Sequence, residues 1–160
     1  MFDPKKEVPN LELCKQLKEL GFPQEGMGWY WGSFEEPNDK YYLCFRYAEN
    51  RLVLYGGLAG TNENCVWDAF NDPPVMIKAP TCRELGEWLP DIIIVKSDEP
   101  ISYFIKYQKN KWRYRYVDKH GRMLNTEFIE ADTEPNARAK MLIWLAKNNY
   151  IKFNKGDNDA

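Results

Sequence analysis

Residues 132–147 contain the longest run of strong helix formers in this 160-residue chain. Thr133 suits the N-cap and Pro135 suits the first turn, so a helix over residues 133–148 is predicted. Its second half is apolar over an arc much wider than one stripe, through Ala137, Met141, Leu142, Ile143, Trp144, Leu145 and Ala146. A helix of this kind has to be covered on more than one side. We therefore expect it to be the main helix of the core.

Two further helices have clear boundaries. Asn10 suits the N-cap of a helix over residues 10–20, and Gly21 suits the left-handed position that ends it. Thr81 and Glu84 have the spacing of a capping box, which predicts that another helix begins at Thr81 and runs to residue 89. Three helices are therefore expected.

Alternating or β-branched apolar residues predict the strands. These are expected over residues 26–33, 41–47, 52–55 and 92–95, and in a three-stranded meander over residues 101–129. Residues 56–80 are irregular, and this long stretch is either functional or contains a further strand, for which residues 75–77 are the candidate. The fold class is α+β: a single domain over residues 1–153 with a mostly antiparallel sheet of about six strands packed against three helices, followed by a polar, disordered tail over residues 154–160.

The side-chain pattern also predicts how the strands pair. Short loops set the apolar residues of neighbouring strands opposite each other. The second strand of the meander is followed by a three-residue loop with a bulge, in which Asp118 suits position i of a type I turn and Gly121 the left-handed position. The predicted cross-strand pairs are Tyr47 with Leu52, Phe45 with Leu54, Tyr107 with Trp112, Ile105 with Tyr114, and Arg113 with Glu127. Arg113 is therefore expected to belong to a solvated charge ladder.

The composition excludes several classes of function. The formal net charge is −2, from 22 basic and 24 acidic residues, so the chain as a whole has no general attraction to nucleic acid or to an anionic membrane. No apolar run approaches the roughly 18 residues that cross a membrane, and residues 1–7 lack the apolar segment of a secretory signal. Cys14, Cys44, Cys65 and Cys82 are far apart, which indicates reduced, mostly buried thiols. A cytoplasmic protein without a membrane segment, metal or cofactor is expected.

Three phrases of the sequence resemble a known group of proteins. They are LGFPQ at residues 20–24 with the aromatic run at residues 29–31, the capped helix at residues 80–90, and the start of the last helix at residues 133–143. Together they resemble a family of small uncharacterised proteins carried by bacteria and by their phages or prophages. The resemblance leaves residues 34–74 unmatched and carries over no functional residue. It implies a mobile-element context and a helix, sheet, helix layering.

Few residues could carry catalysis. His120 is the single histidine and falls in the predicted turn, where an exposed side chain without a catalytic partner is expected. Cys82 has a physical case for reactivity because the first position of a helix favours a thiolate, but a partly buried structural cysteine is the preferred interpretation. The glycines around residues 56–60 fit no phosphate-binding fingerprint. The sequence therefore favours a protein that is not an enzyme.

Five residues are candidates for ligand binding. A pocket would lie between the sheet and the irregular segment over residues 56–74, with basic and aromatic side chains making the contacts. The candidates are Tyr55, Trp67, Lys106, Arg113 and Arg115.

Three functions remain compatible with this sequence. The first is a non-catalytic cytoplasmic binding or interaction protein of phage or prophage origin, with an unknown protein or small molecule as partner. The second, from a different class, is a small-ligand protein that binds or sequesters a nucleotide-like molecule. The third is weak binding of single-stranded nucleic acid through Lys106, Arg113 and Arg115, which the net charge disfavours. A monomer or small homo-oligomer is expected.

Overall fold

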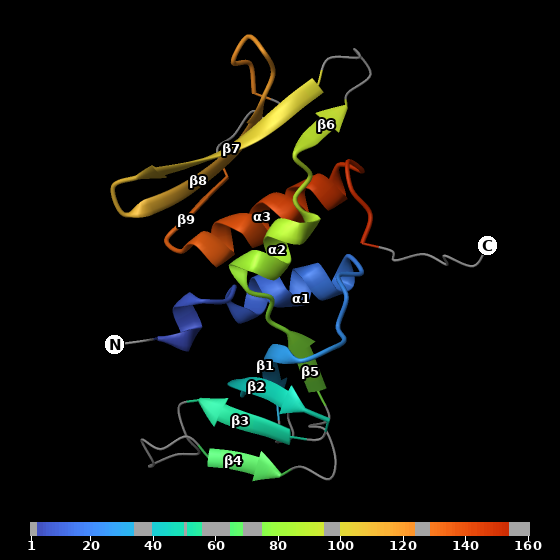
Figure 1. Cartoon of the computed structure of the whole chain (residues 1–160), viewed down its shortest axis with the longest axis vertical. Helices are drawn as coiled ribbons and strands as arrows, with labels where there is room; N and C mark the ends of the chain where they lie inside the picture. The colour runs from blue at the N-terminus through green and yellow to red at the C-terminus, as the bar shows by residue number, and fades with distance from the viewer. Residues whose placement is uncertain are drawn as a thin grey trace, which may run out of the picture.

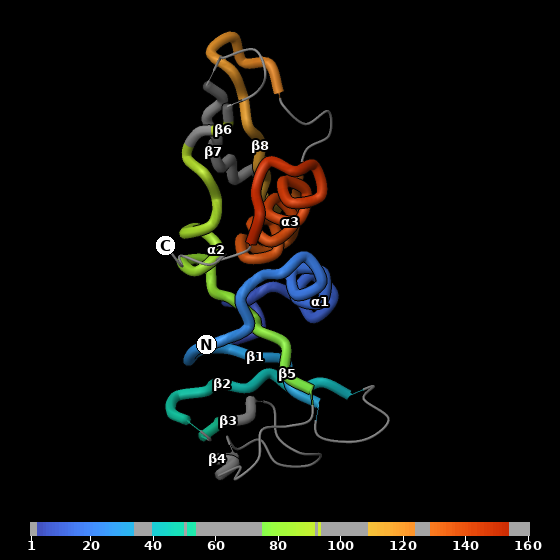
Figure 2. The backbone as a smooth tube through the Cα atoms, turned by 90° about the vertical axis from the view of Figure 1, so that its right-hand side faces the viewer, coloured from blue at the N-terminus to red at the C-terminus, as the bar shows by residue number. Residues whose placement is uncertain are grey.

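The chain forms a layer of helices with an antiparallel sheet on either side of it (Figure 1). Figure 2, turned by 90°, shows the same order of layers. The computed structural model describes residues 3–33, 40–49, 51–55, 65–68, 75–94, 100–123 and 129–153. The predicted tail over residues 154–160 lies outside these ranges.

All three predicted helices are present. They are α1 (Leu11–Glu19), α2 (Cys82–Trp88) and α3 (Glu134–Lys147), preceded by the short 3-10 helix η1 (Pro4–Lys6). Each α-helix begins at its predicted N-cap, whose side chain accepts a hydrogen bond from the backbone of the first turn: Asn10, Thr81 and Thr133. Within the described part of the chain, no helix is both long enough and apolar enough to cross a membrane.

The strands divide between two sheets. The five-stranded sheet has the order β4 (Cys65–Asp68), β3 (Arg51–Tyr55), β2 (Tyr42–Ala48), β1 (Gly28–Ser33) and β5 (Val75–Lys78). The four-stranded sheet has the order β6 (Ile92–Ile94), β7 (Pro100–Gln108), β8 (Lys111–Val117) and β9 (Ile129–Ala131). The α+β class, the antiparallel pairing and the three helices are confirmed. One sheet was expected, but the strands form two sheets, because the helices lie between strands β1–β5 and strands β6–β9.

The segment over residues 56–80 contains two strands. The candidate strand at residues 75–77 is confirmed as β5, which pairs with β1. β4 was not predicted, because its four residues are too few to establish an alternating pattern. Its pairing with β3, which sets Trp67 opposite Leu52, comes from a tertiary contact instead. Residues 56–64 and 69–74, which complete the predicted irregular segment, lie outside the described ranges.

α3 is buried on more than one side, as its broad apolar arc predicted. It packs against β8 and β9 of the four-stranded sheet and against α1 and α2 (Figure 1). Its buried residues are Pro135, Ala137, Ala139, Met141, Leu142, Ile143 and Leu145. Tyr114 and Tyr116 of β8 are fully buried in the same core. Because one face of α3 packs on a sheet and another on helices, a single apolar stripe would not have sufficed.

α1 contributes to two cores. Leu13 and Leu17 belong to the core around α3, whereas Cys14 belongs to a second core against the five-stranded sheet, together with Trp29 and Leu43. The α1 helix thus joins the helical layer to that sheet. Burial raises the pKa of Cys14 to about 12, so its thiol stays protonated.

One predicted hairpin register is confirmed and one is wrong. β7 and β8 pair as predicted, including Tyr107 with Trp112 and Ile105 with Tyr114. Between β2 and β3, however, the register shifts between Arg46 and Ala48, and the pairs are Arg46 with Leu52 and Phe45 with Val53. The predicted pairs of Tyr47 with Leu52 and Phe45 with Leu54 are therefore wrong. The cause is a β-bulge, which places an extra residue, Tyr47, in one strand and moves the pairing by one position.

The register between β8 and β9 also differs from the prediction. Val117 bridges Met123 beside the turn, as the three-residue loop requires. Farther along, Arg113 lies opposite Glu130, three positions beyond the predicted Glu127. The residues between these two points, 124–128, lie outside the described ranges. Arg113 still faces a carboxylate, so the expected ladder exists with a different partner.

Side chains cover backbone groups at one edge of each sheet. β5 and β9 are the end strands of their sheets. Lys140 of α3 donates from Nζ to the carbonyl oxygen of Glu130 in β9 at 2.9 Å. At β5, the N–H of Lys78 donates to Oε1 of Gln24 at 2.9 Å, and Nζ of Lys18 lies 3.5 Å from the carbonyl oxygen of Met76. These backbone groups are therefore occupied and are not open to another strand.

The chain after α3 is anchored by an aromatic cluster. The ring of Phe153 lies 5.4 Å from that of Phe22 and 5.5 Å from that of Trp88, in edge-on arrangements. We expect Phe153→Ala to lower the free energy of unfolding by about 3–5 kcal/mol, because a buried ring is removed. The neighbouring exposed residue supplies the control, and Lys152→Ala should change it by less than about 0.5 kcal/mol. Urea unfolding of the two variants measures both values, and equal losses would contradict the anchoring role.

Candidate interaction surface

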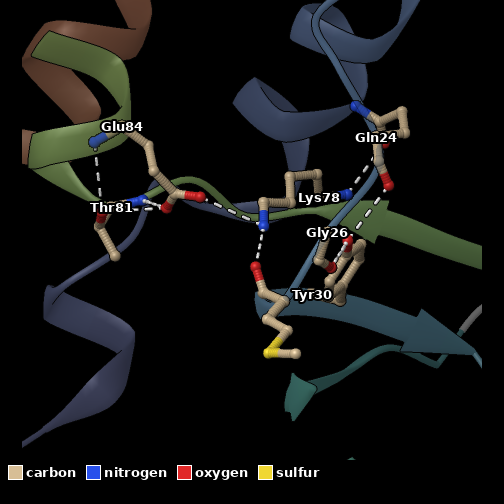
Figure 3. Close-up of polar contacts among 7 residues, drawn as sticks. Gln24, Gly26, Tyr30, Lys78, Thr81 and Glu84 are labelled. Atoms are coloured by element: carbon tan, nitrogen blue, oxygen red, sulfur yellow. Dashed lines mark hydrogen bonds and ion pairs between the residues drawn. The ribbon is translucent and has the colours of Figure 1, made fainter. Parts of the chain in front are cut away.

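The most unusual charged group in the described structure is the buried ammonium of Lys78. Lys78 ends β5 and is only 4% exposed. Its Nζ lies 3.2 Å from Oε1 of Glu84 in α2 and donates to the carbonyl oxygen of Met27 at 2.6 Å (Figure 3). A buried charge is tolerated only when it is paired and hydrogen-bonded. Lys78 therefore ties α2, β5 and the segment before β1 together.

Glu84 has two functions in this arrangement. Its Oε2 accepts hydrogen bonds from the backbone N–H of Thr81 at 2.8 Å and from the Thr81 hydroxyl at 3.0 Å, which completes the predicted capping box. Its Oε1 faces the ammonium of Lys78 (Figure 3). The capping box already orders the carboxylate of Glu84, so forming the ion pair with Lys78 costs little additional side-chain entropy.

The ring of Tyr30 lies beside two cations. Nζ of Lys78 is 4.8 Å from its centroid, and the guanidinium carbon of Arg46 is 5.6 Å from it. Both distances are within the range of cation–π attraction. The Tyr30 hydroxyl donates to the carbonyl oxygen of Gly26 at 2.5 Å and also lies 3.2 Å from that of Gln24. Tyr30 therefore connects the face of the sheet to the segment that precedes β1.

That segment, residues 22–28, is held at several backbone positions. Side chains donate to the carbonyl oxygens of Phe22, Gly26 and Met27, and the carbonyl oxygen of Gln24 lies beside the same Tyr30 hydroxyl that donates to Gly26. Gly26 and Gly28 have φ angles of +91° and +120°, a backbone conformation that residues other than glycine rarely adopt. We call residues 22–28 the braced loop. Phe22 anchors its start in the aromatic cluster, and beyond Phe22 its backbone is held mainly by the polar side chains of Tyr30 and Lys78.

The braced loop presents an exposed methionine. Met27 is 65% exposed and Tyr47 is 38% exposed, and among the residues with described side chains these are the exposed large hydrophobic ones. The pairing of β1 with β2 ends at Gly28 with Arg46, and Met27 and Tyr47 are the residues next to this last pair, one on each chain segment. Tyr47 is also the residue at the β-bulge, a feature that can redirect a side chain. We call these two residues the Met27–Tyr47 corner.

The five residues predicted to bind a ligand do not form one site. Lys106 of β7 pairs with Arg113 of β8, and Arg115 lies two positions farther along β8. Tyr55 and Trp67 lie in β3 and β4 of the other sheet, beyond the helical layer (Figure 1). The structure brings the three basic residues together and separates them from the two aromatic ones.

Arg113 belongs to an ion-pair cluster. Its Nε lies 3.0 Å from Oε2 of Glu130, and Nζ of Lys111 lies 3.2 Å from Oε1 of the same carboxylate. Hydrogen bonds from Lys111 and Arg113 hold the pKa of Glu130 below its usual range. The contacts match the expected solvated charge ladder.

His120 and Cys82 were the two candidates for a reactive side chain. His120 is exposed in the turn, where its backbone N–H donates to Oδ1 of Asp118 at 2.8 Å. Cys82 is half-buried, and burial together with the nearby carboxylate of Glu134 raises its pKa to about 11. Both effects disfavour a thiolate, and the half-buried position agrees with the preferred interpretation of Cys82 as a structural cysteine.

Cys82 also borders a surface hollow of about 310 Å³. The hollow lies where η1, the start of α2, β8 and the start of α3 meet, and its lining includes Lys6, Glu7, Cys82, Trp112, Asp132 and Glu134. Among the side chains that the structure describes, no three of the His, Cys, Asp and Glu type are grouped to hold a metal ion.

Comparison with protein-family models, curated proteins and solved structures finds no match for this chain. What the corner and the hollow can do therefore has to be inferred from their own geometry. Sequence reasoning missed the corner because Met27 was assigned to a strand. The two glycines that flank it were the available signal for a special backbone conformation.

The braced loop makes a testable distinction between those glycines. A Cβ at Gly28 would lie 2.9 Å from Nζ of Lys78, which cannot move without leaving Glu84 and Met27, whereas a Cβ at Gly26 would have no atom within 4 Å. We expect Gly28→Ala to lower the free energy of unfolding by at least about 1 kcal/mol more than Gly26→Ala. Urea unfolding of both variants measures the difference, and equal effects would show that the ammonium is not fixed.

Proposed function

We propose that the protein is a non-catalytic binding protein that attaches to another protein through the Met27–Tyr47 corner. The observation that carries this proposal is an exposed methionine on a loop whose carbonyl groups accept hydrogen bonds from buried side chains. A loop that is ordered before binding loses little conformational freedom on binding, so more of the contact energy remains as affinity.

The residue types also suit a protein interface. Methionine and tyrosine are enriched in the cores of interfaces, and tyrosine is frequent among the residues that dominate binding energy. Complete burial of a methionine side chain contributes about 1.5–3 kcal/mol. With Met27 65% exposed, most of that contribution is still available to a partner.

The proposal also includes a phage or prophage origin and action in the cytoplasm of the bacterial host. The resemblance at residues 20–24, 80–90 and 133–143 supports a phage or prophage origin. The free, buried thiols of Cys14 and Cys44 suit the reducing cytoplasm of a bacterial host. A binding protein made by a mobile element would act on a component of that host.

Variants of the corner test the binding function. Wild-type protein, Met27→Ser and Tyr47→Ser are used to capture proteins from bacterial cytoplasm, and each captured protein is then purified and titrated by calorimetry. We expect each substitution to weaken binding at least about tenfold, because a central apolar contact is lost. The stability of Met27→Ser should change little, since that side chain is 65% exposed. Tyr47 is only 38% exposed, so urea unfolding has to show that Tyr47→Ser is folded before its binding is compared.

The control for this experiment is Lys152→Ser, at an exposed residue on the segment after α3. It should bind like the wild type. Binding that survives the double substitution of Met27 and Tyr47 would contradict the assigned surface. Enzymatic turnover that disappears in His120→Ala or Cys82→Ala would contradict the non-catalytic part of the proposal.

A second candidate function is small-ligand binding in the hollow beside Trp112. Its volume of about 310 Å³ lies at the lower end of the range of ligand pockets, roughly 300–1,000 Å³. Its lining includes the carboxylates of Glu7, Asp132 and Glu134 but one lysine, Lys6. Glu134 is paired with Arg138, which leaves Glu7 and Asp132 against Lys6. This balance opposes a phosphate, so a neutral or cationic ligand fits better than the nucleotide-like one expected from the sequence.

A thermal-shift panel separates the two ligand classes. Small amines should raise the melting temperature of the wild type in a dose-dependent way, whereas nucleotides should not, because the carboxylates repel their phosphates. Glu7→Gln, at an exposed position in the lining, should weaken the effect of the amines. A shift caused by nucleotides, or no shift with any compound, would remove this candidate.

A further inference from the structure

An exposed acidic residue stands two positions along the chain from each residue of the corner. Glu25 precedes Met27 by two residues and Glu49 follows Tyr47 by two, and both carboxylates are exposed. The cations on the same part of the sheet are engaged elsewhere. Lys78 is paired with Glu84, and Arg46 stacks on the ring of Tyr30.

Arg51 is an exposed cation at the same end of the sheet. It begins β3 and pairs with Ala48 of β2 and with Asp68 of β4. Among the described side chains, the exposed charges near the corner are therefore the carboxylates of Glu25 and Glu49 and the guanidinium of Arg51. A partner with basic side chains around its contact surface would complement this balance, whereas an acidic partner would be repelled.

The structure also opposes strand addition at the nearest sheet edge. At β5, the N–H of Lys78 is bonded to Gln24, and the carbonyl oxygen of Met76 lies beside Nζ of Lys18. An added strand would have to displace both groups before it could form a ladder. A partner is therefore better able to contact the corner with its side chains than to add a strand at β5.

A second copy of the chain is a poor occupant of the corner. Two identical corners related by a twofold axis would bring Glu25 and Glu49 of one copy close to those of the other. Like charges placed together across an interface lower the affinity. The occupant has to differ in charge from the corner itself.

Resting on the proposed function, we propose that the partner is a protein with an apolar pocket for Met27 and Tyr47 that is bordered by lysine or arginine side chains. The apolar contacts supply most of the affinity, and the carboxylates of Glu25 and Glu49 select basic partners and speed their association. The contact is made by side chains and does not extend the five-stranded sheet.

A displayed library of random peptides tests this chemistry without a known partner. Peptides are selected on the wild type and counter-selected on the variant that combines Met27→Ser with Tyr47→Ser. We expect the enriched peptides to combine apolar residues with lysine or arginine. Their affinity for the variant that combines Glu25→Lys with Glu49→Lys should fall about tenfold in about 50 mM salt, and the loss should shrink in about 500 mM salt, because salt screens exposed charges.

The matched control reverses two exposed carboxylates elsewhere. Glu19→Lys combined with Asp91→Lys changes the net charge by the same amount at positions on α1 and after α2, away from the corner. This variant should bind the peptides like the wild type. An equal loss in the control would mean that net charge, and not the corner, selects the peptides, and would overturn the inference.

The remaining outcomes separate the inference from the function on which it rests. Peptides that require Met27 and Tyr47 but lack basic residues, and that ignore the reversal of Glu25 and Glu49, would overturn the inference and leave the proposed function standing. A failure to enrich any peptide that depends on Met27 and Tyr47 would overturn the inference, while the capture experiment decides the function. A wild-type dimer in sedimentation analysis that Met27→Ser dissociates would also overturn it, by making a second copy the occupant.

Discussion

The buried ammonium of Lys78 is the constraint on which the arrangement around it depends. Taking this charge out of water is unfavourable by several kcal/mol unless an opposite charge and hydrogen-bond acceptors replace the lost hydration. Glu84 supplies the charge, the carbonyl oxygen of Met27 supplies an acceptor, and the ring of Tyr30 supplies a face. Met27 and Tyr30 come from the segment that enters β1, and Glu84 comes from α2, so the lysine helps to fix where that segment and α2 lie relative to β5.

Apolar packing in the helical layer and the polar contacts around Lys78, which we call the polar centre, both hold the molecule together. α3 is covered by the four-stranded sheet and by the other helices, and α1 contributes residues to both apolar cores. Apolar burial there is large but has little directional preference. The polar centre adds direction at the point where α2 meets the five-stranded sheet. Its hydrogen bonds hold an exposed methionine on a rigid base, and this is what makes Met27 a candidate contact residue.

Local signals in the sequence predicted the local structure well. The caps at Asn10, Thr81 and Thr133 and the hairpin that pairs Tyr107 with Trp112 depend on residues a few positions apart, and all are confirmed. The bulge at Tyr47 was missed because a single extra residue changes a register without changing the alternation of side chains. The partner of Arg113 lies three positions beyond the predicted one. The ion pair of Lys78 was missed as well, although Glu84 is six residues away, because Glu84 was identified as a capping residue alone and nothing in the sequence marked Lys78 as buried.

The side chains that occupy the edges of β5 and β9 bear on how the protein behaves when it is concentrated. Two open sheets in a chain of this size would present rows of unpaired backbone groups, which are templates for edge-to-edge polymerisation. Lys140 occupies the carbonyl group of Glu130, and Gln24 occupies the N–H of Lys78. A neighbouring molecule that approached either edge would meet a bound side chain and, at β9, a charged one that is hard to desolvate. Lys140 and Gln24 thus make one edge of each sheet a poor template for edge-to-edge association.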